Sequence, residues 1–159
     1  MKATLFLLLA AIAAAQPAAA PSEVNSSTIV FVCEHGAAKS VVAAAHFNKL
    51  AAEKGIPYRA VSRGTNPEET VAPAVKSGLA AEGLDVSAWR PRAISDEDIK
   101  RAKSVVSLAT DLPTNKPLAR SKLVEWNDVP PMSADYQAAR NAIVKLVSEL
   151  VNNLSNRKQ

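Results

Sequence analysis

Residues 31–47 read "FVCEHGAAKSVVAAAHF", and this stretch decides the architecture of the chain. The apolar, β-branched segment 28–32 predicts a strand buried on both faces. The alanine-rich segment 40–54 predicts a helix that ends at Gly55. Between them lies the only cysteine of the chain, Cys33. A strand, a short loop and a helix in this order are typical of an anion site, because loop amides and a helix N-terminus both attract negative charge.

The loop between this strand and helix, residues 33–39, is called the cysteine loop below. Gly36 can take the positive φ that a tight turn requires. The surrounding backbone amides would stabilise the thiolate of Cys33, Lys39 would add a positive charge, and the Ser40 hydroxyl could donate to the sulfur. A thiolate at the bottom of a phosphate-sized cup is a nucleophile suited to phosphoryl transfer. An inert buried cysteine is the alternative.

The rest of the pattern alternates strands with helices. Further strands are expected at 58–63, 104–109 and 122–126. Further helices are expected at 70–82, 94–102 and 133–154. This alternation predicts an α/β fold with three layers, α/β/α, around a central four-stranded parallel sheet. Ligands of such sheets bind beyond the carboxyl ends of the strands, so three further strand ends should converge on Cys33: 62–65, 109–111 and 127–128.

The first 20 residues predict a secretory signal peptide and leader. A charged start is followed by the apolar run "ATLFLLLAAIAAA" and small residues, with cleavage expected after Ala15 and a site after Ala20 as the alternative. The run is shorter than the roughly 20 residues of a spanning helix, so no stable membrane anchor is expected after cleavage. We therefore expect an exported protein, periplasmic or secreted, with one folded domain over residues 28–155.

Composition narrows the function classes. The chain has 159 residues, of which 48% are hydrophobic and 21% charged, enough for one domain with a substantial core. Its net charge of +4 is spread without a basic run, so nucleic acid is not an expected partner. The sequence has no cluster of metal ligands, and no metal or other cofactor is expected. One cysteine cannot form an internal disulfide, although exported proteins usually pair their cysteines.

Two known phosphate-binding loops share this layout. The Walker A pattern G-x-x-x-x-G-K-[ST] is met at Lys39 and Ser40, but Cys33 and Ala38 replace both of its glycines, which argues against a nucleotide site. The loop C-x5-R-S belongs to the low-molecular-weight protein tyrosine phosphatases and their arsenate reductase relatives. The cysteine loop resembles it, with Lys39 in place of the arginine.

The resemblance to this family continues, in order, from residue 29 to residue 150. "AVSRGTNPEETVAPAVKSGLAAEGLDVS" resembles the family's second strand, its S-x-G-T turn and the stretch that follows. "AKSVVSLATD" resembles the third strand, and "VEWNDVPPMSADYQAARNAIVKLV" resembles the region of the catalytic aspartate and the C-terminal helix. The resemblance implies a phosphotyrosine phosphatase I-like fold. It also implies a hydrolase that dephosphorylates phosphomonoesters, with phosphotyrosine as a candidate, through a cysteinyl-phosphate.

The same resemblance assigns roles to residues of this chain. Cys33 would be the nucleophile, Asp128 the general acid, and Ser40 the partner of the thiolate. Asp111, which also follows a predicted strand, is a rival for the acid role. The oxyanion would be bound by Lys39 and by the loop residues Glu34, His35, Gly36, Ala37 and Ala38.

Three departures from the family pattern bear on activity. Lys39 is a point charge where an arginine would offer a planar fork, and losing one charge-assisted contact costs about 1.5–3 kcal/mol, or about 10- to 150-fold in rate. Arg63, within "SRGT", could return a guanidinium to the cup, with a surface arginine as the alternative. No tyrosine directly follows Asp128, which leaves the aromatic wall for a phosphotyrosine ring in doubt.

Two other functions remain open. Arsenate mimics phosphate, so the first is an arsenate reductase. It would use an external thiol, because Ala109 stands about where an internal resolving cysteine would be expected. The second is a non-catalytic oxyanion-binding protein, motivated by Lys39 in place of arginine. The expected partners are phosphate, a phosphomonoester or arsenate, with an external thiol reductant for the reductase.

Overall fold

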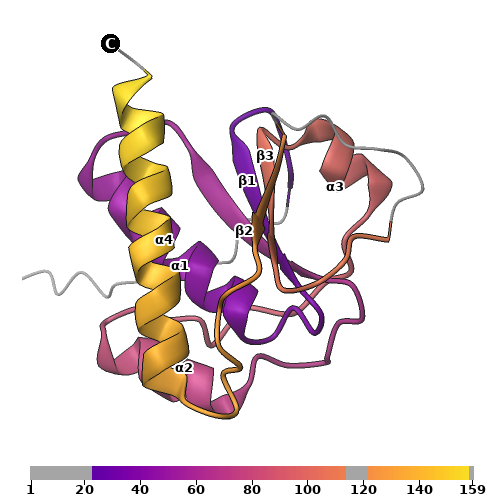
Figure 1. Cartoon of the computed structure of the whole chain (residues 1–159), viewed down its shortest axis with the longest axis vertical. Coiled ribbons are helices and arrows are strands. Elements are labelled where there is room, and N and C mark those ends of the chain that lie inside the picture. The colour runs from indigo at the N-terminus through magenta and orange to yellow at the C-terminus, as the bar shows by residue number, and fades with distance from the viewer. Residues whose placement is uncertain (1–22, 114–121, 158–159) are drawn as a thin grey trace, which may run out of the picture.

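Four strands form one parallel sheet at the centre of the chain (Figure 1). The computed structural model describes residues 23–113 and 122–157, so the predicted leader lies outside the described residues. The sheet has the order β2-β1-β3-β4. Its strands are β1 (Thr28–Cys33), β2 (Arg59–Gly64), β3 (Ser104–Leu108) and β4 (Leu123–Trp126). Cys33 is paired in register with Gly64, so the thiol lies level with the end of β2.

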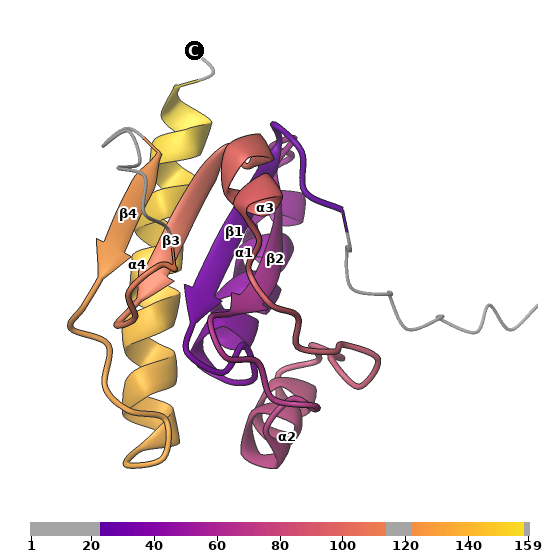
Figure 2. The same ribbon diagram turned by 90° about the vertical axis from the view of Figure 1, so that its right-hand side faces the viewer.

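Helices cover both faces of the sheet, which confirms the predicted three-layer fold. α1 and α4 lie on one face and α3 on the other (Figure 2). The helices are α1 (Lys39–Glu53), α2 (Pro73–Ala81), α3 (Asp96–Arg101) and α4 (Tyr136–Asn156). Within the described ranges, none of these helices is both long and apolar enough to cross a membrane.

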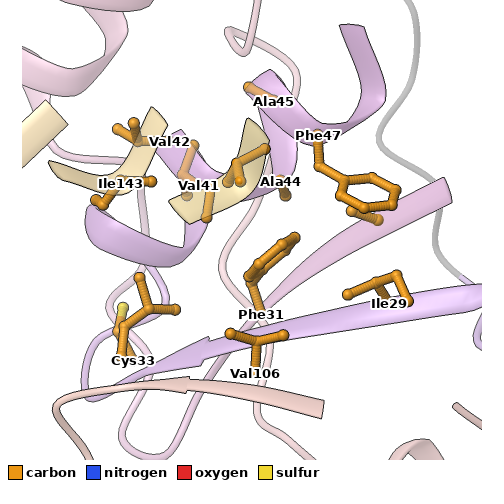
Figure 3. Packing of buried hydrophobic residues seen from close by; sticks show 14 of the residues in the cluster. Ile29, Phe31, Cys33, Val41, Val42, Ala44, Ala45, Phe47, Val106 and Ile143 are labelled. Atoms are coloured by element: carbon orange, nitrogen blue, oxygen red, sulfur yellow. The ribbon is translucent and has the colours of Figure 1, made fainter. Parts of the chain in front are cut away.

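The strands alternate their side chains between two apolar layers. Ile29, Phe31 and Cys33 of β1 face α1 and α4, whereas Val30 and Val32 belong to the layer on the α3 side. Phe31 meets the ring of Phe47 of α1 edge to face, with centroids 5.9 Å apart. Figure 3 shows Cys33 continuing this apolar row to the end of β1. The packing of the core thus fixes the direction in which the thiol points.

Element boundaries differ from the predicted ones by a few residues, and caps explain the differences. α4 begins at Tyr136 rather than at residue 133, because Asp135 caps it by accepting a hydrogen bond from the Ala138 N–H at 2.9 Å. α2 begins at Pro73, where a proline suits the first helical position. α3 begins at Asp96, because Ser95 caps it by accepting a hydrogen bond from the Asp98 N–H at 3.1 Å.

The outer edge of β2 is closed by groups from the same chain. The side chain of Asn48, on α1, accepts from the Ala60 N–H at 2.6 Å and donates to the Ala60 carbonyl at 3.1 Å. At the end of the strand, the Gly64 N–H donates to the Arg92 carbonyl and the Gly64 carbonyl accepts from Ile94. The side-chain amide of Asn48 therefore replaces part of a neighbouring strand.

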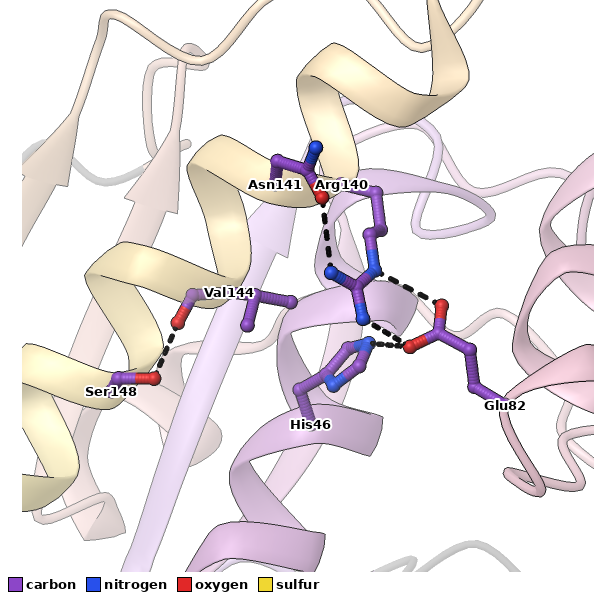
Figure 4. A network of polar contacts seen from close by, with 6 residues as sticks. All are labelled: His46, Glu82, Arg140, Asn141, Val144 and Ser148. Atoms are coloured by element: carbon purple, nitrogen blue, oxygen red, sulfur yellow. Dashed lines mark hydrogen bonds and ion pairs between the residues drawn. The ribbon is translucent and has the colours of Figure 1, made fainter.

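A partly buried polar cluster joins three helices (Figure 4). His46 of α1 is 4% exposed, and its Nε2 lies 3.4 Å from Oε2 of Glu82 at the end of α2. Glu82 also pairs with the guanidinium of Arg140 on α4. Burial lowers the pKa of His46 below its usual 6.5, although Glu82 opposes this. The hydrogen bond from Arg140 lowers the pKa of Glu82 below its usual 4.5.

Both shifts predict a protein that loses stability as the pH falls. Below a pH of 6.5 the unfolded chain takes up a proton at His46 before the folded chain does, and below 4.5 the same holds for Glu82. Urea unfolding between about pH 7.5 and 5 should therefore show a falling free energy of unfolding. His46→Gln should flatten that slope below 6.5. An unchanged slope in the variant would contradict this account.

Candidate active site

The backbone of the cysteine loop is held by the segment that follows β2. The carbonyl oxygens of residues 33–37 all accept hydrogen bonds from residues 62–72. The donors are the N–H groups of Thr65, Asn66, Glu68 and Ala72, at 2.7–3.1 Å, and the Ser62 hydroxyl, at 3.1 Å. Five consecutive carbonyls thus point toward one neighbouring segment.

The amides of the loop must then point the other way. In a trans peptide the N–H of one residue lies opposite the carbonyl of the residue before it, and the described chain has no cis peptide bond. The N–H groups of residues 34–38 are therefore directed away from residues 62–72. Within the described chain these five N–H groups donate to no acceptor. They form a row of donors available to an anion.

The start of α1 offers further unpaired donors at the same place. Its N-cap, Ala38, has no side chain that can cap, and the first turn holds no acidic residue. The first residue, Lys39, is a cation at the positive end of the helix dipole, where negative charge is normally favoured. The start of α1 therefore has unpaired N–H donors and a positive side chain, and no acidic residue of its first turn balances them. The arrangement suits a bound oxyanion.

Two glycines let the loop pack closely against the end of β2. Gly36 has φ of +60°, and a Cβ built there would lie 2.8 Å from the backbone nitrogen of Gly64. A Cβ on Gly64 would in turn lie 2.8 Å from the nitrogen of Gly36. Such contacts are too short for real carbon atoms, so both positions require glycine. The positive φ expected at Gly36 is present.

The sulfur of Cys33 begins a chain of hydrogen bonds from β1 to β2. Cys33 is 5% exposed, and its Sγ lies 3.1 Å from Ser40 Oγ, which lies 2.8 Å from Ser62 Oγ. The Ser62 hydroxyl donates to the Gly36 carbonyl at 3.1 Å. Because Ser62 has one hydrogen, Ser40 must donate to Ser62, and the thiol must donate to Ser40. Cys33, Ser40 and Ser62 each contribute one hydrogen, so all three hydrogen bonds can form when Cys33 is a neutral thiol.

Loss of the thiol proton reverses part of this chain. A thiolate can only accept, so the Ser40 hydrogen has to turn to the sulfur, and one of the two Ser62 contacts is left without a hydrogen. Ser62 was not among the predicted site residues. The signal for it was its place at the end of a predicted strand, within "SRGT". Ser62 is thus a member of the site that competes with the sulfur for Ser40.

The cysteine loop borders a cavity of about 390 Å³. Cys33 and Lys39 both line it, together with the end of β3 and the loop between β4 and α4. The lining residues are Cys33, Glu34, His35, Ala38, Lys39, Leu108, Ala109, Pro131, Met132 and Ser133. Ala109 has φ of +50°, a rare conformation for a residue with a Cβ. The end of β3 converges on Cys33 as predicted, and Ser62 brings in the end of β2.

Two exposed carboxylates lie beside the cysteine loop. His35 is half-exposed and lies between two carboxylates, 3.7 Å from Glu34 and 3.8 Å from Glu68. Ala37, in the same loop, is buried. The side chains of Glu34 and His35 thus lie at the mouth of the cavity, while the anion-binding row is built from backbone.

The side chain of Lys39 contacts the loop between β4 and α4, residues 127–135. Its Nζ donates to the Val129 carbonyl at 3.2 Å. Asp128 is the residue next to this contact, but it is exposed and does not line the cavity. Its carboxylate has no hydrogen bond or ion pair with any residue that the structure describes. Its rival Asp111 is also exposed and does not line the cavity.

The structure does not place Arg63 at the cup. Neighbouring residues of a strand face opposite sides, and since Ser62 faces the cysteine loop, Arg63 faces α3. Its Nε donates to the carboxylate of Asp98 at 2.9 Å, and the side chain is buried rather than on the surface. The expectation that Arg63 replaces the missing loop arginine is therefore wrong, and so is the alternative of a surface arginine.

No group of three or more potential metal ligands is found among residues 23–113 and 122–157. The site in this part of the chain consists of a thiol, a lysine, two hydroxyls and backbone amides. These groups can bind a tetrahedral oxyanion and attack its central atom.

Ser40→Ala and Ser62→Ala should change the reactivity of Cys33 in opposite directions. Loss of Ser40 removes the hydroxyl that can donate to the thiolate, so alkylation by iodoacetamide should slow. Loss of Ser62 removes the competing acceptor, so alkylation should become about 2- to 10-fold faster, the worth of one hydrogen bond. Mass spectrometry follows the reaction at this sole cysteine. Ser148→Ala, on α4, is the control, and slowing in both test variants would contradict the assigned directions.

Comparison with known proteins gives the family. The model of the low molecular weight phosphotyrosine protein phosphatases matches residues 28–125. The fold is similar to an arsenate reductase from Archaeoglobus fulgidus (30% identity, TM-score 0.61), over 78% of this chain and 98% of that one. It is similar to the low molecular weight protein tyrosine phosphatase from T. tengcongensis (22% identity, TM-score 0.70), over 79% and 98%. A thioredoxin-dependent arsenate reductase from Corynebacterium glutamicum is also similar (22% identity, TM-score 0.67), over 87% of this chain and 65% of that one. The chain belongs to the low molecular weight phosphotyrosine protein phosphatase family.

Proposed function

We propose that the protein is a phosphatase that hydrolyses phosphomonoesters through a cysteinyl-phosphate. The observation that carries this proposal is the orientation of the cysteine loop, whose five carbonyls are bonded to residues 62–72 and whose amides are therefore free to bind an oxyanion beside Cys33. Membership of a phosphatase family supports the same reaction. Lys39 is the only lysine or arginine among the described residues that line the cavity.

The reaction takes place in two steps. The Cys33 thiolate attacks phosphorus, the bond from phosphorus to the ester oxygen breaks, and Asp128 gives its proton to the leaving oxygen. Water then attacks the cysteinyl-phosphate, Asp128 accepts a proton from that water, and the sulfur–phosphorus bond breaks to release phosphate and the thiolate. The loop amides and Lys39 stabilise the charge on the phosphoryl oxygens in both steps.

The residues that line the cavity influence which leaving groups a substrate can carry. Outside the cysteine loop the lining includes the apolar residues Leu108, Pro131 and Met132, and no aromatic side chain lines the described cavity. A phosphotyrosine ring would pack on aliphatic groups there, as would an alkyl leaving group. The exposed carboxylates of Glu34 and Glu68 disfavour acidic groups next to the phosphate. We propose neutral or basic phosphomonoesters, with phosphotyrosine among the candidates.

Arsenate reduction by an external thiol is the second candidate. Solved structures with this fold include arsenate reductases, one of them 30% identical over 78% of the chain. Cys33 would attack arsenic and displace water, and a second thiol would then attack the Cys33 sulfur, forming a disulfide while arsenic leaves as arsenite with two electrons. The second thiol must come from another molecule, because the chain has one cysteine and Ala109 lies at the cavity wall.

The phosphatase is tested with p-nitrophenyl phosphate and the purified mature protein. Cys33→Ser should abolish hydrolysis. Lys39→Arg should raise it by about 10- to 150-fold, because a guanidinium binds two phosphoryl oxygens at once. Lys145→Met, which removes an exposed lysine of α4, should leave the rate unchanged. Arsenate with an external thiol is assayed alongside.

Three outcomes distinguish the functions. Hydrolysis that requires Cys33 supports the phosphatase. Arsenite production without hydrolysis of phosphomonoesters supports the reductase instead. If neither substrate turns over but phosphate protects Cys33 from alkylation, the protein is a binding protein and the catalytic proposal is wrong.

We also propose that the protein is exported. The sequence of its first 20 residues supports this, as described above. Expression of the full chain in a bacterial host, followed by N-terminal sequencing of the extracellular or periplasmic fraction, should give a mature protein that begins at Gln16. Full-length protein retained in the cytoplasm would contradict export.

A further inference from the structure

Lys39 connects two parts of the site that are 90 residues apart in the chain. It is the first residue of α1 and lines the cavity beside Cys33. Its Nζ donates to the Val129 carbonyl, in the loop that also supplies Pro131 and Met132 to the lining of the cavity. The contact therefore joins the anion-binding start of α1 to the loop that carries Asp128.

The loop that Lys39 holds has little freedom of its own. The Val129 side chain is 4% exposed and packs in the core between the sheet and α4. Pro130 and Pro131 follow, and each fixes its φ and the conformation of the residue before it. A turn closed by hydrogen bonds from Ala134 and Asp135 to the Pro131 carbonyl then leads into α4. Fixing the Val129 carbonyl thus fixes the backbone on both sides of it.

Asp128 depends on this anchor for its position. It lies between the end of β4, at Trp126, and the held residue Val129. Its carboxylate makes no hydrogen bond or ion pair with any residue that the structure describes, so no polar contact of its own holds it. Only the backbone on its two sides sets where the carboxylate can reach. On the Val129 side, the hydrogen bond from Lys39 holds this backbone.

We propose that Lys39 is a positioning residue for the proton donor Asp128, in addition to its contact with the oxyanion. This inference rests on the proposed phosphatase function. An ammonium group has three N–H donors, and the bond to Val129 uses one of them. Two donors remain for a bound oxyanion, so the lysine can hold the loop and the substrate at the same time. The ammonium group of Lys39 thus binds the phosphoryl oxygens and also holds the loop that positions the general acid Asp128.

The test compares two substrates with the same phosphoryl group. Release of p-nitrophenolate needs little protonation, whereas phenolate is a stronger base and needs the proton donor. A lysine that only binds the oxyanion affects both substrates equally. A lysine that also positions Asp128 affects phenyl phosphate more. Lys39→Met should therefore lower kcat/KM for phenyl phosphate at least about tenfold more than for p-nitrophenyl phosphate, a part of the total effect of a general acid.

Three variants complete the comparison. Lys39→Arg keeps N–H donors for both contacts and should leave the ratio between the two substrates as in the wild type. Asp128→Asn should show the same excess loss on phenyl phosphate as Lys39→Met. Adding Lys39→Met to Asp128→Asn should not change the ratio further, because the proton donor is already gone. Equal losses on both substrates in Lys39→Met would overturn the inference.

Hydrogen exchange in the anion-free protein tests the contact without catalysis. Peptides covering residues 127–135 should exchange faster in Lys39→Met and at the wild-type rate in Lys39→Arg and in the control Lys145→Met. Unchanged exchange in Lys39→Met overturns the inference, whatever the activity. If the wild type hydrolyses neither substrate, the proposed function fails, and faster exchange in Lys39→Met alone still supports Lys39 as the anchor of this loop.

Discussion

The hydrogen bonds between the carbonyls of residues 33–37 and the segment 62–72 are the constraint on which the site depends. A short loop after a buried strand could place its peptide planes in either direction. Here the donors after β2 hold the carbonyls on one side, and the planarity of the peptide leaves the amides on the other. The close contact of Gly36 with Gly64 allows the two backbones to approach this far. The row of free N–H groups of residues 34–38 thus results from the hydrogen bonds that the carbonyls of residues 33–37 accept on the other side of the loop.

The start of α1 shows what this arrangement costs the folded protein. A helix start normally has a capping side chain and acidic residues in its first turn, but this one has alanine as its N-cap and a lysine at its first position. These choices leave donors unpaired and place positive charge where the helix dipole is already positive. Natural sequences break such local rules where a ligand restores the balance. An oxyanion would do so here, by accepting from the amides and neutralising Lys39.

Much of the fold and part of the site could be predicted from the sequence. The β-branched run before Cys33 and the alternation of strands and helices gave the sheet and its layers, because burial on both faces requires such runs. Gly36 could be predicted because a tight turn needs its positive φ. The side to which Arg63 points could not, because it depends on the register of β2, and a shift of one residue reverses it. The contact of Lys39 with Val129 could not be predicted either, because it joins residues 90 positions apart and no local sequence pattern indicates such a pair.

The edge of the sheet at β2 has a consequence for how the protein behaves at high concentration. An open edge strand offers its backbone to any other extended chain, which is the usual first step toward fibrous aggregates. The amide of Asn48 occupies both backbone groups of Ala60, and residues 92–94 occupy those of Gly64. A foreign strand would have to displace these partners before it could add to the sheet on this side. Asn48 and residues 92–94 together thus hinder recruitment of this edge into a growing polymer.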